Sequence, residues 1–193
     1  MNPSYTINDP GHPLHGQTIY LRCFACCTAV VIRFCRDGRV YMPVNKRGPG
    51  CSTFPGKYNV PCGFLEDDET GPQCCARELY EENGIKIPPE RFKFYGNNLE
   101  QDPSTRFEGH AVNRYIAILT DEDFENGVVD QTHAAELGTT GGEKDEVSER
   151  RWMKLGYYSM YEWAFDQKEL LAQICEDIRN GVIANPYATK LCL

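Results

Sequence analysis

One stretch decides the fold of this chain, residues 63–85: Gly63-Phe-Leu-Glu-Asp-Asp-Glu69-Thr-Gly-Pro-Gln-Cys-Cys-Ala-Arg77-Glu78-Leu-Tyr-Glu81-Glu82-Asn-Gly84-Ile85. Its residues 72–83 predict a helix, because a proline suits the first helical turn and a glycine suits the C-terminal end. On that helix Glu78 and Glu82 share one face, with Glu81 beside them. Three carboxylates on one surface repel one another, whereas Mg²⁺ or Mn²⁺ binds oxygen ligands of this kind. The stretch therefore predicts a metal site that faces a phosphate.

An acidic helix face can also be plain solvated surface, with Glu81 paired to Arg77 one turn earlier. The spacing of the whole stretch favours the metal site. The stretch resembles the Nudix box, in which a glycine, a glutamate, an Arg-Glu pair, an aliphatic residue, a Glu-Glu pair, a second glycine and a second aliphatic residue stand at fixed distances. Here those places are filled without a gap or a substitution by Gly63, Glu69, Arg77, Glu78, Leu79, Glu81, Glu82, Gly84 and Ile85.

The resemblance implies an α/β Nudix fold, with a mixed β-sheet sandwiched between α-helices. It also implies the metal ligands. Glu78 and Glu82 would bind Mg²⁺, or Mn²⁺ in its place, with Glu81 contributing directly or through water and the carbonyl of Cys62 completing the site. Arg77 is expected to hold the loop together by pairing with an acid of the box rather than to touch the substrate.

The implied activity is hydrolysis of a diphosphate linkage in a nucleoside diphosphate joined to another moiety, such as a nucleotide sugar or an ADP-ribose-like compound. Such a reaction needs a carboxylate that orients or deprotonates the attacking water. In the family this group comes from the box helix or from a downstream loop, where Glu143, Asp145 and Glu146 are the candidates. Any one of these three can equally be solvated loop charge, and Glu146 is carried forward as the loop candidate.

Two other function classes stay open. A Nudix-fold module can sense a ligand without catalysis, although such modules usually lose box acids or carry a DNA-binding segment. A Nudix-fold isomerase of an isoprenoid diphosphate usually departs from the box pattern. Metal-dependent turnover would separate the hydrolase from both.

Composition bounds the remaining classes. The 193 residues suggest a single Nudix domain over residues 19–193 with C-terminal helices, preceded by an irregular lead-in over residues 1–18. No membrane span or secretory signal is visible, so we expect a cytoplasmic protein. A formal net charge of −8 argues against broad binding to nucleic acid. The expected partner is a small nucleotide-type substrate. A homodimer is possible, although no residue marks an interface.

Ten cysteines need an interpretation. Cys23, Cys26 and Cys27 form a C-x-x-C-C cluster, but no second ligand pair of similar spacing supports a zinc site. We therefore expect buried free thiols of a reducing compartment rather than metal ligands or disulfides.

Hydrophobic patterning outlines the remaining elements. Strands are expected at residues 19–34 (one long or two short), 40–44, 58–63, 92–99, 111–119 and 150–155. Helices are expected at residues 157–165 and 168–180, and residues 121–146 are expected to be a long polar connection.

Overall fold

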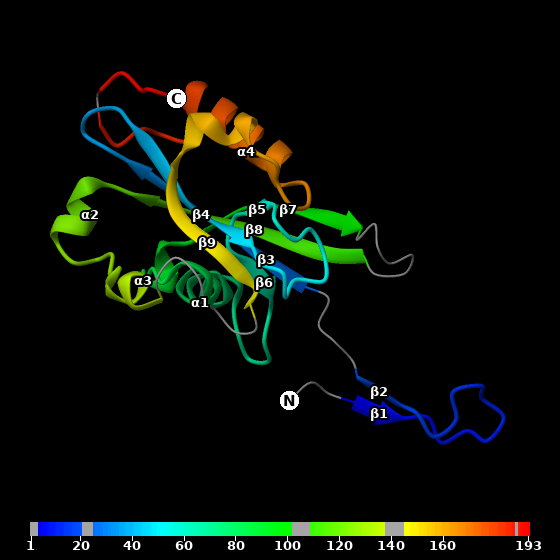
Figure 1. Cartoon of the computed structure of the whole chain (residues 1–193). Helices are drawn as coiled ribbons and strands as arrows, with labels where there is room; N and C mark the ends of the chain where they lie inside the picture. The colour runs from blue at the N-terminus through cyan, green and yellow to red at the C-terminus, as the bar shows by residue number, and fades with distance from the viewer. Residues whose placement is uncertain (1–3, 21–24, 102–108, 138–144, 188) are drawn as a thin grey trace.

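The computed structural model describes residues 4–20, 25–101, 109–137, 145–187 and 189–193. Within these residues a seven-stranded mixed sheet lies between helices, with α1, α2 and α3 on one side and α4 on the other (Figure 1). Its strands are β3 (Ala25–Phe34), β4 (Val40–Arg47), β5 (Tyr58–Asn59), β6 (Cys62–Phe64), β7 (Lys93–Gln101), β8 (Gly109–Leu119) and β9 (Val147–Lys154). The helices are α1 (Gly71–Asn83), α2 (Asp121–Glu125), α3 (Thr132–Leu137) and α4 (Gln167–Arg179), with short 3₁₀ turns η1 (Pro89–Arg91) and η3 (Leu155–Met160). The expected Nudix architecture is confirmed.

The sheet runs in the order β5-β4-β3-β8-β7, with β6 also paired to β3 and β9 to β4. The central pair, β3 and β8, is parallel in the register Ala25↔Ala111, and the pairs β3–β4, β4–β9 and β7–β8 are antiparallel. The end of β4 thus pairs with both β5 and the start of β9, and β6, where the box begins, pairs with the first half of β3.

Two hydrophobic cores lie on opposite faces of the sheet, and alternate residues of β3 contribute to each. Val30 and Ile32 pack toward α4, whereas Ala29 and Val31 pack toward α1. Because both faces of β3 are covered, the strand is nearly continuously apolar. The amphipathic pattern predicted for residues 168–180 is confirmed by α4, which buries Leu170, Leu171, Ile174, Cys175 and Ile178.

Helix α1 begins and ends close to where the sequence predicts. Thr70 is its N-cap, and the Thr70 backbone N–H donates to Gln73 Oε1 at 2.9 Å, which forms one half of a capping box. Gly84 ends the helix in the left-handed region, with φ of 68°, and its N–H donates to the Tyr80 carbonyl. A side chain at position 84 would also overlap the backbone of Ala134 in α3. Glycine is therefore required here both for the backbone conformation and for the close packing against α3.

The N-terminal lead-in is more regular than expected. It contains strands β1 (Ser4–Thr6) and β2 (Thr18–Tyr20), which form their own antiparallel two-stranded sheet. The Gly16 N–H donates to the Ile7 carbonyl at 2.8 Å and helps to close the intervening turn, so the backbone groups of this polar segment find partners locally. The boundary between lead-in and domain at residue 18 remains a prediction.

The expectation of a long loop over residues 121–146 is wrong for its described part, which contains α2 and α3. Thr120 caps α2, because its backbone N–H and hydroxyl both bond to Asp123 Oδ2, at 2.8 and 2.9 Å. The high acid content that suggests a loop reflects ion pairing instead. Glu143 lies outside the described residues.

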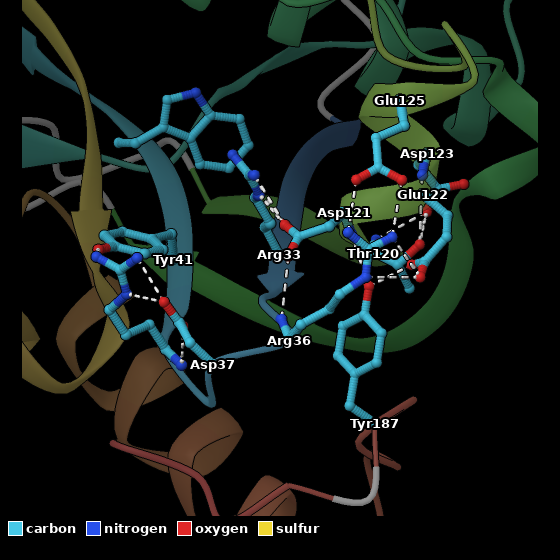
Figure 2. A network of polar contacts seen from close by, with 12 residues as sticks. Arg33, Arg36, Asp37, Tyr41, Thr120, Asp121, Glu122, Asp123, Glu125 and Tyr187 are labelled. Carbon is cyan, nitrogen blue, oxygen red and sulfur yellow. Dashed lines mark hydrogen bonds and ion pairs between the residues drawn. The ribbon is translucent and has the colours of Figure 1, made fainter.

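Those ion pairs join α2 to the end of β3 (Figure 2). Arg33 Nη2 donates to Asp121 Oδ1 at 2.8 Å, and Arg36 bonds to the carboxylates of Glu122 and Glu125. The Tyr187 hydroxyl also bonds to Glu122, so the same network holds the C-terminal segment.

The predicted helix over residues 157–165 is also wrong, because only the 3₁₀ turn η3 forms. Residues 162–164 run beside β5 instead: the Tyr58 N–H donates to the Glu162 carbonyl and the Ala164 N–H to the Tyr58 carbonyl. These backbone groups are therefore engaged in strand-like pairing and cannot complete helical turns. The predicted strand over residues 58–63 splits into β5 and β6 around Pro61, which lacks an N–H to donate. No helix among the described residues is long and apolar enough to cross a membrane.

Candidate active site

Glu82 belongs to the last turn of α1, but its carboxylate lies in space against the backbone of Cys62, the residue just before the first box glycine. Glu82 Oε2 accepts a hydrogen bond from Asn45 Nδ2 at 2.8 Å and from the Cys62 backbone N–H at 3.2 Å. Asn45 comes from the middle of the sheet on β4, and Cys62 begins β6. The last turn of α1 is thereby joined to two strands.

Glu78 lies one turn earlier on the same helix and packs over Gly63. A Cβ at position 63 would overlap the Glu78 carboxylate, so only glycine leaves room for it. Glu78 is 9% exposed, and its Oε1 accepts from Arg77 Nη1 at 2.6 Å. Glu78 and Glu82 therefore lie together at the Cys62–Gly63 backbone, as predicted from their spacing.

Burial dominates the electrostatics of this pair. Removal from water raises the pKa of Glu78, and the neighbouring Arg77 offsets only part of that effect. Burial also raises the pKa of Glu82, and the charge of Glu78 raises it further. Two buried carboxylates that disfavour each other's ionisation are a site that a divalent cation would stabilise in the charged form.

The donor set fits Mg²⁺. Among the described residues, no group of three or more histidine, cysteine, aspartate or glutamate side chains is placed to hold a metal ion. Mg²⁺ commonly takes only one or two carboxylates and fills its other positions with water and substrate phosphate oxygens. Glu78 and Glu82 would supply the two carboxylates of that pattern, beside the backbone of Cys62.

Arg77 organises the loop, and the predicted pairing with Glu69 and Glu81 is confirmed. Its guanidinium forms two parallel bonds to Glu69, both of 2.9 Å, and a third bond of 3.0 Å to Glu81 Oε2. A fourth bond, of 3.0 Å, reaches the Phe64 carbonyl. The contact from Arg77 to Glu78 was not predicted. The Glu81 side chain is 55% exposed, so it lies at the solvent edge of the box.

The loop candidate Glu146 is held by the loop that follows β4. Its backbone carbonyl accepts from the Gly48 N–H at 2.7 Å and from Cys51 Sγ at 3.2 Å, and its side chain is exposed. Within the described part of the chain, no hydrogen bond or ion pair joins the Glu146 side chain to the box acids. The structure thus joins residues 145–146 to the loop that follows β4, not to α1.

Several site residues escape sequence reasoning because strands far apart in the chain bring them together. Arg150 Nε donates to the Glu82 carbonyl at 2.5 Å, and β4 pairs with β9 in the register Asn45↔Arg150. Buried Asn83 donates to the Val44 carbonyl at 3.0 Å. Gln167 is buried at the start of α4, and its Oε1 accepts from the Val60 N–H at 2.7 Å. Only Asn83 gives a local signal, as a polar residue beside the box acids on an otherwise packed helix.

The cysteines agree with the interpretation as free thiols. The buried cysteines of the described residues carry free thiols, and they are Cys27, Cys35, Cys74, Cys75 and Cys175. Burial raises the pKa of the Cys62 thiol well above its usual range, which leaves it uncharged beside the box acids. Cys192 is exposed, and Cys23 lies outside the described residues.

Comparison with known proteins agrees with this geometry. A NUDIX domain model matches residues 27–174, which covers the sheet, the box and most of α4. The chain belongs to the NUDIX domain family. The stretch that resembles the Nudix box, residues 63–85, lies within the matched region.

The similarity to individual relatives is more limited. The chain is 50% identical over 42 residues to phosphatase NudJ of Escherichia coli K12, a match that covers 21% of this chain and 28% of NudJ. The chain thus matches well under half the length of that relative.

Solved structures share the fold at low identity. The NUDIX domain of Shewanella oneidensis NrtR, complexed with ADP ribose, has a TM-score of 0.57 at 18% identity and covers 79% of this chain and 86% of its own. A MutT/nudix family protein from Enterococcus faecalis has a TM-score of 0.60 at 14% identity, with 87% and 66% covered. A C. elegans Ap4A hydrolase in a binary complex has a TM-score of 0.53 at 16% identity, with 81% and 98% covered. These likenesses support the Nudix fold.

Proposed function

We propose that this protein is a Mg²⁺-dependent hydrolase that cleaves the diphosphate linkage of a nucleoside diphosphate joined to another moiety. The observation that carries the proposal is the pair of buried carboxylates, Glu78 and Glu82, held against the Cys62–Gly63 backbone. A structural role alone gives no reason to bury two like charges one helical turn apart.

The residues of the box divide the work. Glu78, Glu82 and the Cys62 carbonyl would hold the metal, and Asn45 fixes the orientation of the Glu82 carboxylate through its bond of 2.8 Å. When bound, Mg²⁺ polarises the bridging phosphates and offsets the charge that develops on them. Arg77 keeps the loop closed around these ligands through Glu69.

The carboxylate that orients the attacking water is proposed at one of two places. Glu81 lies on the box helix with an exposed side chain held by Arg77 at 3.0 Å. Glu146 lies on the segment before β9 and is also exposed. Kinetics of matched amide variants must choose between them.

A nucleotide-type substrate is supported by two of the similar structures, one complexed with ADP ribose and one of an Ap4A hydrolase. The free thiols fit the reducing cytoplasm expected from the sequence. The possible homodimer remains a prediction.

The test is turnover of the purified protein with Mg²⁺ or Mn²⁺ on nucleotide sugars, ADP-ribose, NADH and dinucleoside polyphosphates. Glu82→Gln and Glu78→Gln keep the shape of the side chain but remove its charge, and each is expected to lower kcat by about 10²-fold or more. Glu122→Gln, an acid of α2 outside the box, is the matched control and should keep full activity. Lack of turnover on every compound, with wild type and variants alike, would contradict the hydrolase and favour a ligand-sensing module.

Kinetics of the two amide variants complete the test. If Glu81 orients the water, Glu81→Gln lowers kcat sharply and Glu146→Gln leaves kcat near the wild-type value. The opposite result assigns the role to Glu146.

A further inference from the structure

Two aromatic side chains from different loops meet beside the box. Phe54, in the loop between β4 and β5, and Phe165, just before α4, pack edge to face with ring centroids 5.0 Å apart and an interplanar angle of 71°. Both residues are half-buried, so part of each ring remains open to solvent. Tyr58, by contrast, is buried in the core beside α4 and has a structural role.

Both phenylalanines adopt a backbone conformation that bulky residues rarely take. Phe54 has φ of 50° and Phe165 has φ of 56°. Each such residue costs on the order of 1 kcal/mol or more, and it persists only where its surroundings hold it. The two strained residues contact each other, although they lie 111 positions apart in the sequence. Asp68 and Asp145 also have positive φ, but Phe54 and Phe165 are the bulky residues among the four. Strain at two bulky residues that contact each other points to a function for that pair.

The residues next to Phe165 hold it in place. Asp166 bonds to Arg114 on β8 and, at 2.5 Å, to Asn98 on β7. Gln167 bonds to the backbone of Val60 between β5 and β6. The segment that carries Phe165 is therefore bonded to β7 and β8 on one side of the sheet and to the residue that follows β5 on the other.

The loop of Phe54 is fixed in a similar way. Arg47 Nε donates to the Thr53 carbonyl at 2.9 Å, and the Lys57 N–H donates to the Phe54 carbonyl at 3.2 Å. The other end of this loop bonds to residues 145 and 146, since the Gly50 N–H donates to the Asp145 carbonyl at 3.1 Å.

This ring pair lies near the box acids. Gln167, two residues after Phe165, has its Nε2 3.8 Å from Cys62 Sγ. Arg47 ends β4 two residues after Asn45, whose side chain donates to Glu82 Oε2 at 2.8 Å. The rings and the metal ligands therefore belong to one continuous region.

Two cations accompany the rings. Arg47 Cζ lies 5.2 Å from the centroid of Phe165, and Lys57 Nζ lies 5.3 Å from the centroid of Phe54. Open aromatic rings next to cations match a ligand that has a planar ring attached to phosphate, because the rings stack on the base and the cations attract the phosphates.

We propose that Phe54 and Phe165 form the subsite that binds the nucleobase of the substrate, with Arg47 and Lys57 on the side of its diphosphate. The proposal rests on the hydrolase function above in one respect: the ligand is the nucleoside diphosphate substrate. Phe54 and Phe165, which lie outside the Nudix box, would make the protein prefer a diphosphate that carries a base over one that does not.

The test is calorimetric binding of two non-hydrolysable probes to the Mg²⁺-loaded protein: α,β-methylene ADP-ribose, which has a base, and methylenediphosphonate, which has none. Phe54→Ala and Phe165→Ala are each expected to weaken binding of the first probe by about 5- to 150-fold, the range that loss of one base–aromatic stack gives. Binding of the second probe should be unchanged. Phe54→Trp should restore affinity for the first probe.

Tyr157→Ala is the matched control, because Tyr157 also pairs with a lysine, with Lys154 Nζ 5.5 Å from its ring centroid. It lies beyond the far end of β9, where Lys154 pairs with Tyr41, whereas the box end of β9 pairs with Arg47. Its removal should leave both probes unaffected. Thermal melts of all variants confirm folding.

Equal weakening of both probes in Phe54→Ala and Phe165→Ala, or no weakening of either, overturns the proposal. Failure of the wild type to bind α,β-methylene ADP-ribose overturns it as well. If the wild type binds this probe selectively through the two rings but hydrolyses no diphosphate, the hydrolase function fails while the base subsite stands.

Discussion

Replacement of Gly63 by alanine should separate catalysis from folding. A Cβ at this position would stand 2.7 Å from Glu78 Oε2 and closer still to the other carboxylate atoms, whereas ordinary contact begins near 3.4 Å. Because the nearest oxygen, Oε1, would be only 1.9 Å away, the Glu78 carboxylate must move by about 1.5 Å, and a misplacement of about 1 Å already costs roughly 10²-fold in rate. Metal ligands tolerate only about 0.2 Å of error, so affinity for Mg²⁺ should fall too.

The fold should tolerate the same change. The atoms that would be displaced are the end of a flexible side chain, and Gly63 does not have positive φ, so we expect a loss of unfolding free energy of only about 1 kcal/mol. Steady-state kinetics and Mg²⁺ titration measure the first effect, and urea denaturation measures the second. Gly96→Ala is the matched control, because a Cβ there meets nothing within 4 Å.

A double-mutant cycle makes the reasoning sharper. If Gly63→Ala acts by moving Glu78, it should have little further effect on activity in a Glu78→Gln background. Wild-type kcat and Mg²⁺ affinity in Gly63→Ala would refute the role assigned to Glu78. Additive losses in the double variant would show that the alanine acts by another route.

Three further predictions concern stability and reactivity. Burial raises the pKa of Glu78 and Glu82 above the ordinary 4.5, so the stability linked to their protonation is fully present below that pH and is lost as pH rises through the folded pKa values. Thermal melts of the metal-free protein from about pH 5 to about pH 8 should show this decline. Glu82→Gln or added Mg²⁺ should make the decline smaller. Arg77→Lys cannot form the two parallel bonds to Glu69 and should lose about 2 kcal/mol in urea denaturation together with activity; an unchanged midpoint would contradict this. A thiol reagent should modify exposed Cys192 in the folded protein but reach Cys74 only after unfolding, and rapid labelling of Cys74 by mass spectrometry would show that the core opens.

Local signals explain why some elements could be predicted from sequence. Helix α1 has a proline in its first turn and Gly84 after its last residue, and α4 has an apolar stripe of helical period. The box spacing likewise places Glu78 and Glu82 together without knowledge of the rest of the chain. These features depend on residues within one or two turns of one another.

The remaining features depend on partners that the sequence does not identify. The acids of α2 predict a loop until Arg33 and Arg36 are known to lie opposite them. Residues 162–164 are not helical because β5 takes their hydrogen bonds. Asn45 and Arg150 reach Glu82 only through the pairing of β4 with β9, a register that no local pattern sets.

The parallel pair at the centre of the sheet affects how the chain must fold. β3 pairs with β8 over nine residues in the register from Ala25↔Ala111 to Arg33↔Leu119, so the middle of the sheet stays open until the ribosome has released β8. β9, which supplies Arg150 to the end of α1, emerges later still. A nascent chain that has just completed the box therefore presents an apolar strand with an unpaired edge, a state that aggregates readily and for which chaperones have affinity. Glu78 and Glu82 are synthesised early, but their surroundings are complete only after β9 has emerged.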